Sequence, residues 1–196
     1  YRDNREKIIA QASQMQDIFS KINQRSAVLN QPLLPFVDKI ISYLDEEHGS
    51  FKGAPKFPQF YLFDAMFYFY LKTNDEKYLK PVETLLKNIC SKGIYDQLIG
   101  GIARYTVDDK WIIPHFEKML YDNIQFISLL SKFYQSTKSD YFKSKLIQTI
   151  NYINTEFVND IGLYGSAYDA DSEGVEGKFY TWSFEELSKI LQNNLN

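Results

Sequence analysis

Apolar residues recur every three or four positions through most of the chain, which is the spacing of amphipathic helices. This periodicity predicts helices at residues 4–23, 33–47, 57–72, 75–91, 114–136, 140–157 and 183–192. The segment 57–72 is apolar nearly all round, which predicts burial on every side. Strand-like alternation of Gly and aromatic residues is confined to 94–107 and 162–182, where short hairpins are expected.

Two of these helices have recognisable first turns. Pro114 is a residue favoured at the first helical position, and it predicts that a helix begins there. Ser183 and Glu186 have the spacing of a capping box, which predicts the start of the last helix.

The connections between the helices alternate in length: long at 48–56, short at 73–74, long at 92–113, short at 137–139 and long at 158–182. Successive connections of antiparallel helices lie at opposite ends, so every long loop is expected at one end of the molecule. The long loops hold most of the glycines and the clustered carboxylates, as expected of an active face on a helical scaffold. An inner ring of helices enclosed by an outer one, an α/α toroid, would bury 57–72. The alternative is a bundle or solenoid without a pocket.

Composition excludes several classes of function. The net charge is −3 and no basic cluster is present, which argues against a nucleic-acid partner. Cys90 is the single cysteine, so the chain has no disulfide framework or cysteine-based metal site, and Cys90 is expected to be a small buried hydrophobe. We find no signal peptide and no membrane span, and we expect a cytoplasmic protein without a cofactor.

The stretch "PHFEKMLYDN" (114–123) gathers the strongest candidates for chemistry. On a helix, His115, Lys118 and Asp122 would share one stripe, and Glu117 and Tyr121 a second one. His115 can exchange protons near neutral pH and is the best candidate for a general acid or base. A solvated helix end with Glu/Lys pairing remains the alternative.

The long-loop face carries both charges, aromatic side chains and glycines, which suits a polyhydroxylated ligand such as a sugar. The predicted catalytic residues are His115, Glu117, Asp169 and Asp171, with the last two as carboxylate partners of the histidine. The residues expected to bind the substrate are Lys56, Asp96, Arg104, Trp111, Lys118, Tyr121 and Asp122.

The stretch "DADSEG" (169–174) invites comparison with a calcium loop. An EF-hand needs Asp or Asn at the fifth position and Glu at the twelfth, where this chain has Glu173 and Tyr180. We therefore expect no metal site there, although a looser calcium site stays open. Paired carboxylates could also serve glycoside hydrolysis, where their separation decides the outcome.

Three segments resemble a known family: "GAPKFP" (53–58), "YDQLIGGIARYTVDDKW" (95–111) with "PHFEKMLYDN", and "AYDADSEGVEGKFYTW" (167–182). In order and spacing they are similar to the bacterial YyaL-type proteins, which contain the domain DUF255, and to their animal relatives, the spermatogenesis-associated thioredoxin-like proteins. The resemblance implies an all-α (α/α)6 toroid, similar to N-acylglucosamine 2-epimerases and six-hairpin glycosidases, with short β-hairpins in the long loops.

The resemblance also implies a domain organisation. Residues 1–196 would form one incomplete toroid domain, with 1–23 as a connecting helix, and the N-terminal thioredoxin-like domain and the last hairpins would lie outside this chain. Ala103 stands where some members have His, and the epimerases of this fold use a histidine pair, so only His115 is a credible catalytic histidine here.

Two functions are therefore expected. The first is a carbohydrate-active enzyme, either a sugar epimerase or isomerase, or a glycoside hydrolase. The alternative is a non-catalytic module that binds a sugar or peptide and works with the thioredoxin-like domain of the same full-length chain. A purely structural scaffold would leave the crowding of polar groups at one end unexplained.

Overall fold

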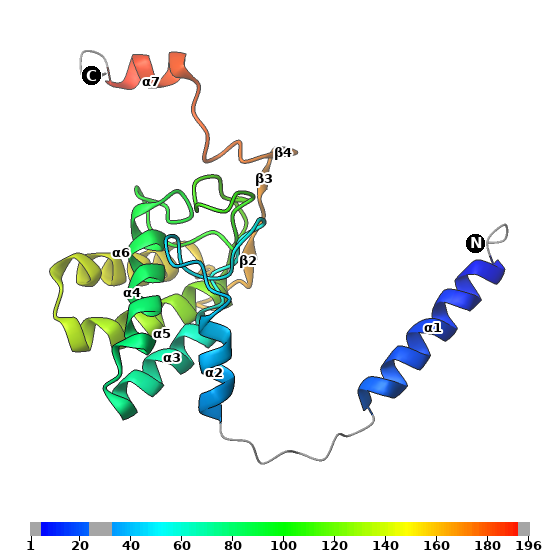
Figure 1. The fold of residues 1–196 in the computed structure, drawn as a ribbon. Helices are drawn as coiled ribbons and strands as arrows, with labels where there is room; N and C mark the ends of the chain where they lie inside the picture. Colours follow the sequence, from blue (N-terminus) through cyan, green and yellow to red (C-terminus); the bar gives the residue numbers. More distant parts are fainter. Residues whose placement is uncertain (1–4, 24–32, 192–196) are drawn as a thin grey trace. The chain divides into compact units, whose positions relative to one another are not determined.

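The computed structural model describes residues 5–23 and 33–191, and the chain divides into two units, residues 1–36 and 37–196 (Figure 1). The first unit contains α1 (Arg5–Asn23), which confirms the helix expected at 4–23. The other helices are α2 (Leu33–Ile41), α3 (Phe60–Thr73), α4 (Glu76–Ser91), α5 (Leu120–Thr137), α6 (Asp140–Glu156) and α7 (Phe184–Leu191).

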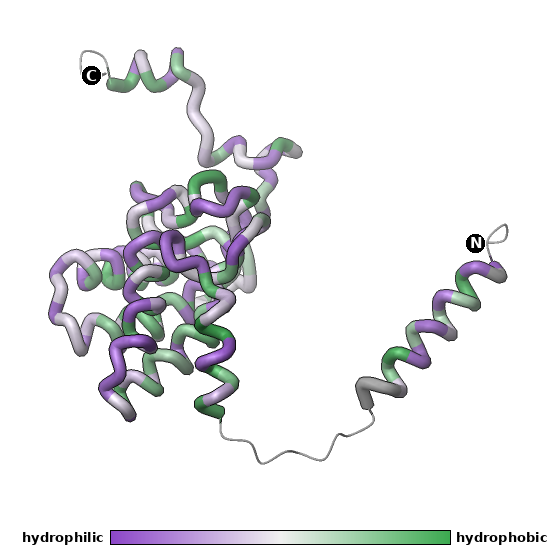
Figure 2. The backbone as a smooth tube through the Cα atoms, in the orientation of Figure 1, coloured by the Kyte–Doolittle hydropathy of each residue, from purple (hydrophilic) through white to green (hydrophobic). Residues whose placement is uncertain are grey.

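Four of these helices form two antiparallel hairpins around one core. Helix α3 packs against α4 and α5, and α5 packs against α6. The core consists of apolar side chains from all four, among them Phe63, Leu86, Phe126 and Phe142. Figure 2 shows the alternation of apolar (green) and polar (purple) residues along the helices that produces this packing. The spacing of apolar residues along each helix therefore explains how these four helices pack into one layer.

The short connections are closed by local capping. Asn74 and Lys138 end α3 and α5 in the left-handed conformation, each donating its backbone N–H to a carbonyl of the last turn. The Asp75 side chain accepts the Lys77 N–H at 3.0 Å and caps α4. Helix α7 has the expected capping box, because Glu186 N–H donates to Ser183 Oγ and Ser183 N–H donates to Glu186 Oε2.

The loops between α2 and α3 and between α4 and α5 lie at the same end of the second unit (Figure 1). They are joined by backbone hydrogen bonds, since Lys56 and Thr106 exchange two, at 2.8 and 3.0 Å. The strand β1 (Lys118–Met119) pairs with β2 (Ala167–Tyr168), and β3 (Asp171–Ser172) forms a hairpin with β4 (Val175–Glu176). The expected gathering of these long loops on one face is thereby confirmed, as is a short hairpin within 162–182.

The predicted start of the fifth helix, Pro114, is wrong by six residues, because α5 begins at Leu120. Residues 114–119 are not helical: Phe116 adopts the left-handed conformation at φ 67°, and only Lys118–Met119 form a strand. Their backbone groups bond to other segments, with Glu117 O accepting from Arg104 N–H at 2.9 Å and His115 N–H donating to Tyr105 O at 3.1 Å. Bonds from remote segments outweigh the local preference of proline for a helix start.

Two further boundaries and one burial prediction need correction. Helix α2 ends at Ile41 rather than at 47, because the following residues turn back so that Leu44 bridges to Phe51. Helix α3 begins at Phe60 rather than at 57. It is also not buried on every side, since Tyr61 and Tyr68 are 68% and 55% exposed. Its contacts with α4 and α5 cover only one side.

Gly93 marks the point where the chain leaves α4 against the returning loop. A Cβ at this position would lie 2.0 Å from the carbonyl oxygen of Ile112, whose neighbour Trp111 accepts the Ile94 N–H. Gly93→Ala is therefore expected to lower the free energy of unfolding by about 1–3 kcal/mol, the usual cost of overpacking. Urea denaturation would measure the change. Gly165→Ala is the matched control, because its Cβ would meet only Phe157 O at 3.8 Å, and an equal loss in both variants would contradict the explanation.

Candidate functional site

The non-helical segment 114–119 presents its side chains to two different surroundings. Pro114, Phe116 and Lys118 line a cavity. His115 and Glu117 instead make their ion pairs with Glu176 and Arg104, which do not line that cavity. The residues expected to form one helical stripe are therefore divided between two sites.

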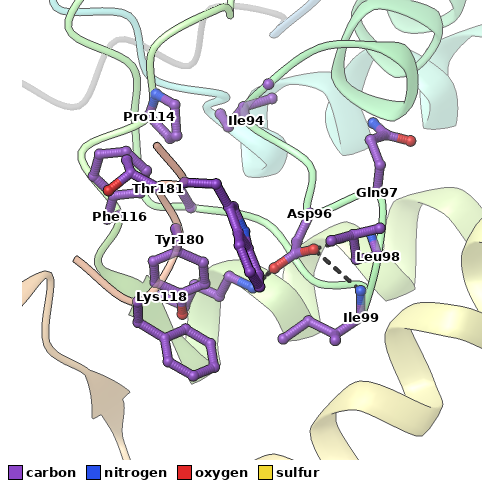
Figure 3. Close-up of a pocket in the computed structure, with 14 residues that line it drawn as sticks. Ile94, Asp96, Gln97, Leu98, Ile99, Pro114, Phe116, Lys118, Tyr180 and Thr181 are labelled. Carbon is purple, nitrogen blue, oxygen red and sulfur yellow. Dashed lines mark hydrogen bonds and ion pairs between the residues drawn. The ribbon is translucent and has the colours of Figure 1, made fainter. Parts of the chain in front are cut away.

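The cavity has a volume of about 680 Å³ (Figure 3). It lies between the loop 93–103, the segment 114–118 and the later segment 179–182. Its walls are mostly apolar or aromatic, and the rings of Phe116 and Tyr180 stack at 5.6 Å with an interplanar angle of 12°. Two of the predicted substrate-binding residues, Asp96 and Lys118, belong to it.

Lys118 is a buried cation, with only 3% of its side chain exposed. Its Nζ lies 2.8 Å from Asp96 Oδ2 and 3.2 Å from Gly100 O, and it sits over the rings of Tyr152 and Tyr180 at 4.4 and 4.9 Å. Burial lowers the pKa of Lys118, against the opposing effect of Asp96. The ion pair makes the inner wall of the cavity electrically neutral overall.

Arg104, Glu117, Tyr121 and Asp122 lie near one another, and together with His115 of the same segment as Glu117 we call them the polar face. Arg104 Nη1 lies 3.3 Å from Glu117 Oε2, with both side chains partly exposed. The pKa of Arg104 is raised by its hydrogen bond to Glu117 and also by Tyr121 and Asp122, so these groups lie within electrostatic range of one guanidinium. Four residues that the sequence singled out are thus brought together.

Asp122 lies in the first turn of α5 and is the most perturbed group of the polar face. Burial raises its pKa to about 6, Arg104 opposes the increase and Glu117 adds to it. Its Oδ2 is the one buried side-chain oxygen or nitrogen, among residues that the structure describes, that has no hydrogen-bond partner. A buried carboxyl oxygen without a partner is costly, and such groups concentrate at functional sites.

His115 is held by two neighbours, Glu176 and Tyr105. Its Nδ1 lies 2.8 Å from Glu176 Oε1, and its ring stacks on Tyr105 at 4.6 Å, which in turn stacks on Phe57 at 4.7 Å. Glu176 was missed by the sequence analysis, which named Asp169 and Asp171 from the same hairpin. The sequence of this hairpin does not show which of its carboxylates pairs with His115, because that depends on where His115 lies in the folded chain.

Two predicted ligand-binding residues are buried away from both sites. Lys56 is 1% exposed and pairs with Asp45 Oδ2 at 2.9 Å, and Trp111 is fully buried with its Nε1–H donating to His48 O at 2.7 Å. Asp169 and Asp171 are exposed, with Asp171 N–H donating to Asp169 Oδ1 at 3.3 Å. The binding and catalytic roles expected for these four residues stay predictions, and their positions do not favour them.

Within residues 5–23 and 33–191, no three His, Cys, Asp or Glu side chains are close enough together to hold a metal ion. Cys90 is fully buried, and burial raises the pKa of its thiol to about 12, as expected for an inert packing residue. None of the described helices has the length and apolar character needed to cross a membrane.

Helical hairpins with all their long loops at one end define the class of the fold, and solved structures agree. The chain aligns over 80% of its length with cellobiose 2-epimerase from Spirochaeta thermophila DSM 6192, covering 40% of that chain with a TM-score of 0.58 and 16% identity. A family 76 glycoside hydrolase from a bovine Bacteroides thetaiotaomicron strain aligns with 59% of this chain and 24% of its own, with a TM-score of 0.50 and 19% identity. The fold is part of the six-hairpin toroid, as predicted.

Sequence relatives identify the family. Over 157 residues, 75% of the chain, the sequence is 34% identical to spermatogenesis-associated protein 20 of Rattus norvegicus, and over 163 residues it is 34% identical to uncharacterized protein B0495.5 of Caenorhabditis elegans. Over this matched part the chain belongs to the spermatogenesis-associated protein 20 family, which confirms the resemblance to the animal relatives. The resemblance to the YyaL-type proteins and to DUF255 stays a prediction. The chain spans about a fifth of the length of these relatives, 20% and 22%. No protein-family model matches it.

Proposed function

We propose that the polar face is the sugar-binding and proton-transfer site of a carbohydrate-active enzyme, either a sugar epimerase or isomerase, or a glycosidase-like hydrolase. The observation that carries the proposal is Asp122, a partly buried carboxyl with an unpartnered oxygen beside the Arg104–Glu117 ion pair. A carboxyl whose pKa lies near 6 can both donate and accept a proton close to neutral pH. The toroid fold shared with sugar-processing enzymes supports the class of substrate but, as an analogy of fold, not the reaction.

Each group of the polar face has a role that its chemistry suits. Arg104 carries several N–H donors in a fixed plane and can orient sugar hydroxyl groups. His115 is proposed as a proton carrier, since the Glu176 carboxylate on Nδ1 favours the tautomer whose free Nε2 accepts a proton. Asp122 is proposed as the second proton-transferring group. Asp169 and Asp171 were expected to be the partners of His115, and we propose Glu176 in that position.

The two reaction classes use these groups differently. Epimerisation needs one group to remove a proton and another to return it on the opposite side, for which His115 and Asp122 are the candidates. Glycoside hydrolysis needs two carboxyl groups, for which Glu117 and Asp122 are the candidates. Product analysis after incubation with a disaccharide separates the classes, because only hydrolysis breaks the glycosidic bond and changes the number of sugar units.

A thermal-shift screen against monosaccharides, amino sugars and sugar phosphates tests sugar binding. A ligand at about ten times its Kd stabilises the folded state by about 1.4 kcal/mol, or about 3–6 °C for a protein of this size. We expect such a ligand to lose its effect in Arg104→Met but keep it in Arg5→Met, which removes the same charge from α1. A shift that survives Arg104→Met in a folded variant would place the sugar elsewhere, and no shift with any sugar would contradict the proposal.

The alternative function, a sugar- or peptide-binding module that works with a thioredoxin-like domain, stays a prediction. So do the organisation into a connecting helix at 1–23 and one incomplete toroid, and the cytoplasmic location. This chain spans about a fifth of the length of its relatives, so the activity of the whole relatives is not assigned to it. An assay of turnover separates the two functions, because a binding module does not convert its ligand.

A further inference from the structure

We infer that the cavity between Asp96, Phe116, Lys118 and Trp182 is a second ligand site, which binds a small uncharged aromatic molecule (Figure 3). Its volume of about 680 Å³ falls within the range of about 300–1,000 Å³ typical of small-molecule pockets. The site does not depend on the proposed sugar site, because none of the residues proposed for the polar face lines this cavity.

Asp96 and Gln97, two polar residues that line the cavity, are already engaged with the protein. Asp96 accepts the Leu98 and Ile99 N–H groups at 3.0 and 3.1 Å in addition to the Lys118 ammonium. Gln97 donates to backbone carbonyls, including Cys90 O at 3.2 Å, and accepts from Lys145 Nζ at 2.7 Å. Recognition through these groups would require breaking existing hydrogen bonds, so apolar contact is the favoured mode.

The walls of the cavity favour a flat ring. Phe116 and Tyr180 already stack on each other, which shows that parallel rings fit between these segments. Ile94 and Ala103 form a buried apolar floor, while the ring of Phe179 lies 65% exposed at the rim. An aromatic ligand would extend this series of rings while covering apolar surface that now faces water.

The ligand is inferred to be uncharged because the cavity has no charge to offer. Lys118 and Asp96 neutralise each other at 2.8 Å. An anion near Lys118 would also approach the Asp96 carboxylate, and a cation near Asp96 would approach the ammonium. A charged ligand would lose its hydration without gaining a counter-ion.

Tryptophan fluorescence can report this binding directly. Of the two tryptophans, Trp111 is fully buried and hydrogen-bonded to His48 O, whereas Trp182 lines the cavity and is 52% exposed. Titrating the full chain with nitrobenzene, an uncharged aromatic quencher, is expected to give saturable quenching at submillimolar concentration. The Trp182→Phe variant should lose the saturable part. The anionic analogue 4-nitrobenzoate should bind at least tenfold more weakly.

Matched variants localise the effect to the cavity. Phe179→Ala is expected to weaken nitrobenzene binding about tenfold, whereas Phe184→Ala, which removes a 78% exposed ring outside the cavity, should leave it unchanged. Ala103→Leu should abolish binding by filling the floor, with circular dichroism to verify folding. If Ala103→Leu does not fold, the Phe179 and Phe184 pair decides. Quenching that rises linearly, as for free tryptophan, or that is equal in the Phe179 and Phe184 variants, would overturn the inference.

Discussion

Replacing Asp45 by asparagine is expected to lower the free energy of unfolding by about 3–5 kcal/mol, a large part of the roughly 5–15 kcal/mol typical of a domain. Asp45 is the counter-ion of Lys56, whose side chain is 1% exposed. Asparagine keeps an oxygen for the backbone N–H groups of Glu47 and His48 but removes the charge. The buried ammonium would keep only Phe51 O at 2.8 Å and the Trp111 ring at 5.4 Å.

The pH dependence of stability should agree with this assignment. Burial alone would raise the pKa of Asp45, but hydrogen bonds from the His48 N–H and from Lys56 outweigh it, and the pKa is lowered. A carboxyl with a lowered pKa stabilises the folded state above the pKa of the unfolded chain, about 4. This contribution is lost as the pH falls through the folded pKa, so the difference between the wild type and Asp45→Asn should shrink in acid.

A double-mutant cycle with Lys56→Met separates the ion pair from general disruption. Lys56→Met alone leaves Asp45 its two N–H donors and some water contact, so we expect a smaller loss of about 1–2 kcal/mol. The double variant should regain about 2–3 kcal/mol relative to the sum of the single losses. Glu83→Ala, which breaks an exposed pair with Lys87, should cost less than about 1 kcal/mol. Additive losses in the cycle would show that the buried pair is not the cause.

The helical layer could be predicted from the sequence because its cause is local. The apolar residues of α4 and α6 repeat along one face, and the predicted bounds 75–91 and 140–157 differ from the observed bounds by one residue at most. The alternation of long and short connections then placed the long loops at one end, since that step needs only the antiparallel order of the helices. Both inferences use information contained in neighbouring residues.

The geometry of the candidate site could not be predicted in the same way, because its partners are remote in sequence. The non-helical conformation of 114–119 depends on hydrogen bonds and bridges to residues 104–106 and 167–168. The predicted helix placed His115 and Lys118 on one stripe, whereas Lys118 lines the cavity and His115 pairs with Glu176 outside it. Lys56 was likewise assigned to a ligand because its counter-ion Asp45, eleven residues earlier, cannot be recognised from spacing alone.

Asp122→Asn is expected to make the protein more stable and less active at the same time. Since burial raises the pKa of Asp122 to about 6, the folded state binds more protons than the unfolded chain between about pH 4 and pH 6. The free energy of unfolding therefore falls as the pH rises through this window, and above pH 6 the charged carboxylate is a net cost. Asparagine removes that cost. One pKa unit corresponds to about 1.4 kcal/mol, and partial exposure screens the effect, so we expect a gain of about 1–2 kcal/mol at pH 7.5.

Urea denaturation at pH 4, 5, 6 and 7.5 measures the stability, and turnover of a sugar identified by the thermal-shift screen measures the activity. The stability of the variant should match that of the wild type at pH 4 and exceed it above pH 6. Asp109→Asn, at an exposed position in the preceding loop, should change neither stability nor turnover.

If Asp122 transfers a proton, turnover should fall by about 10²–10⁴-fold in Asp122→Asn with sugar binding retained. A variant that is less stable than the wild type at pH 7.5 would show that Asp122 is a stabilising, paired charge. A more stable variant with unchanged turnover would show that Asp122 does not transfer a proton, and would assign this step to His115 and Glu117. The buried charge of Asp122 would then lower stability without contributing to catalysis.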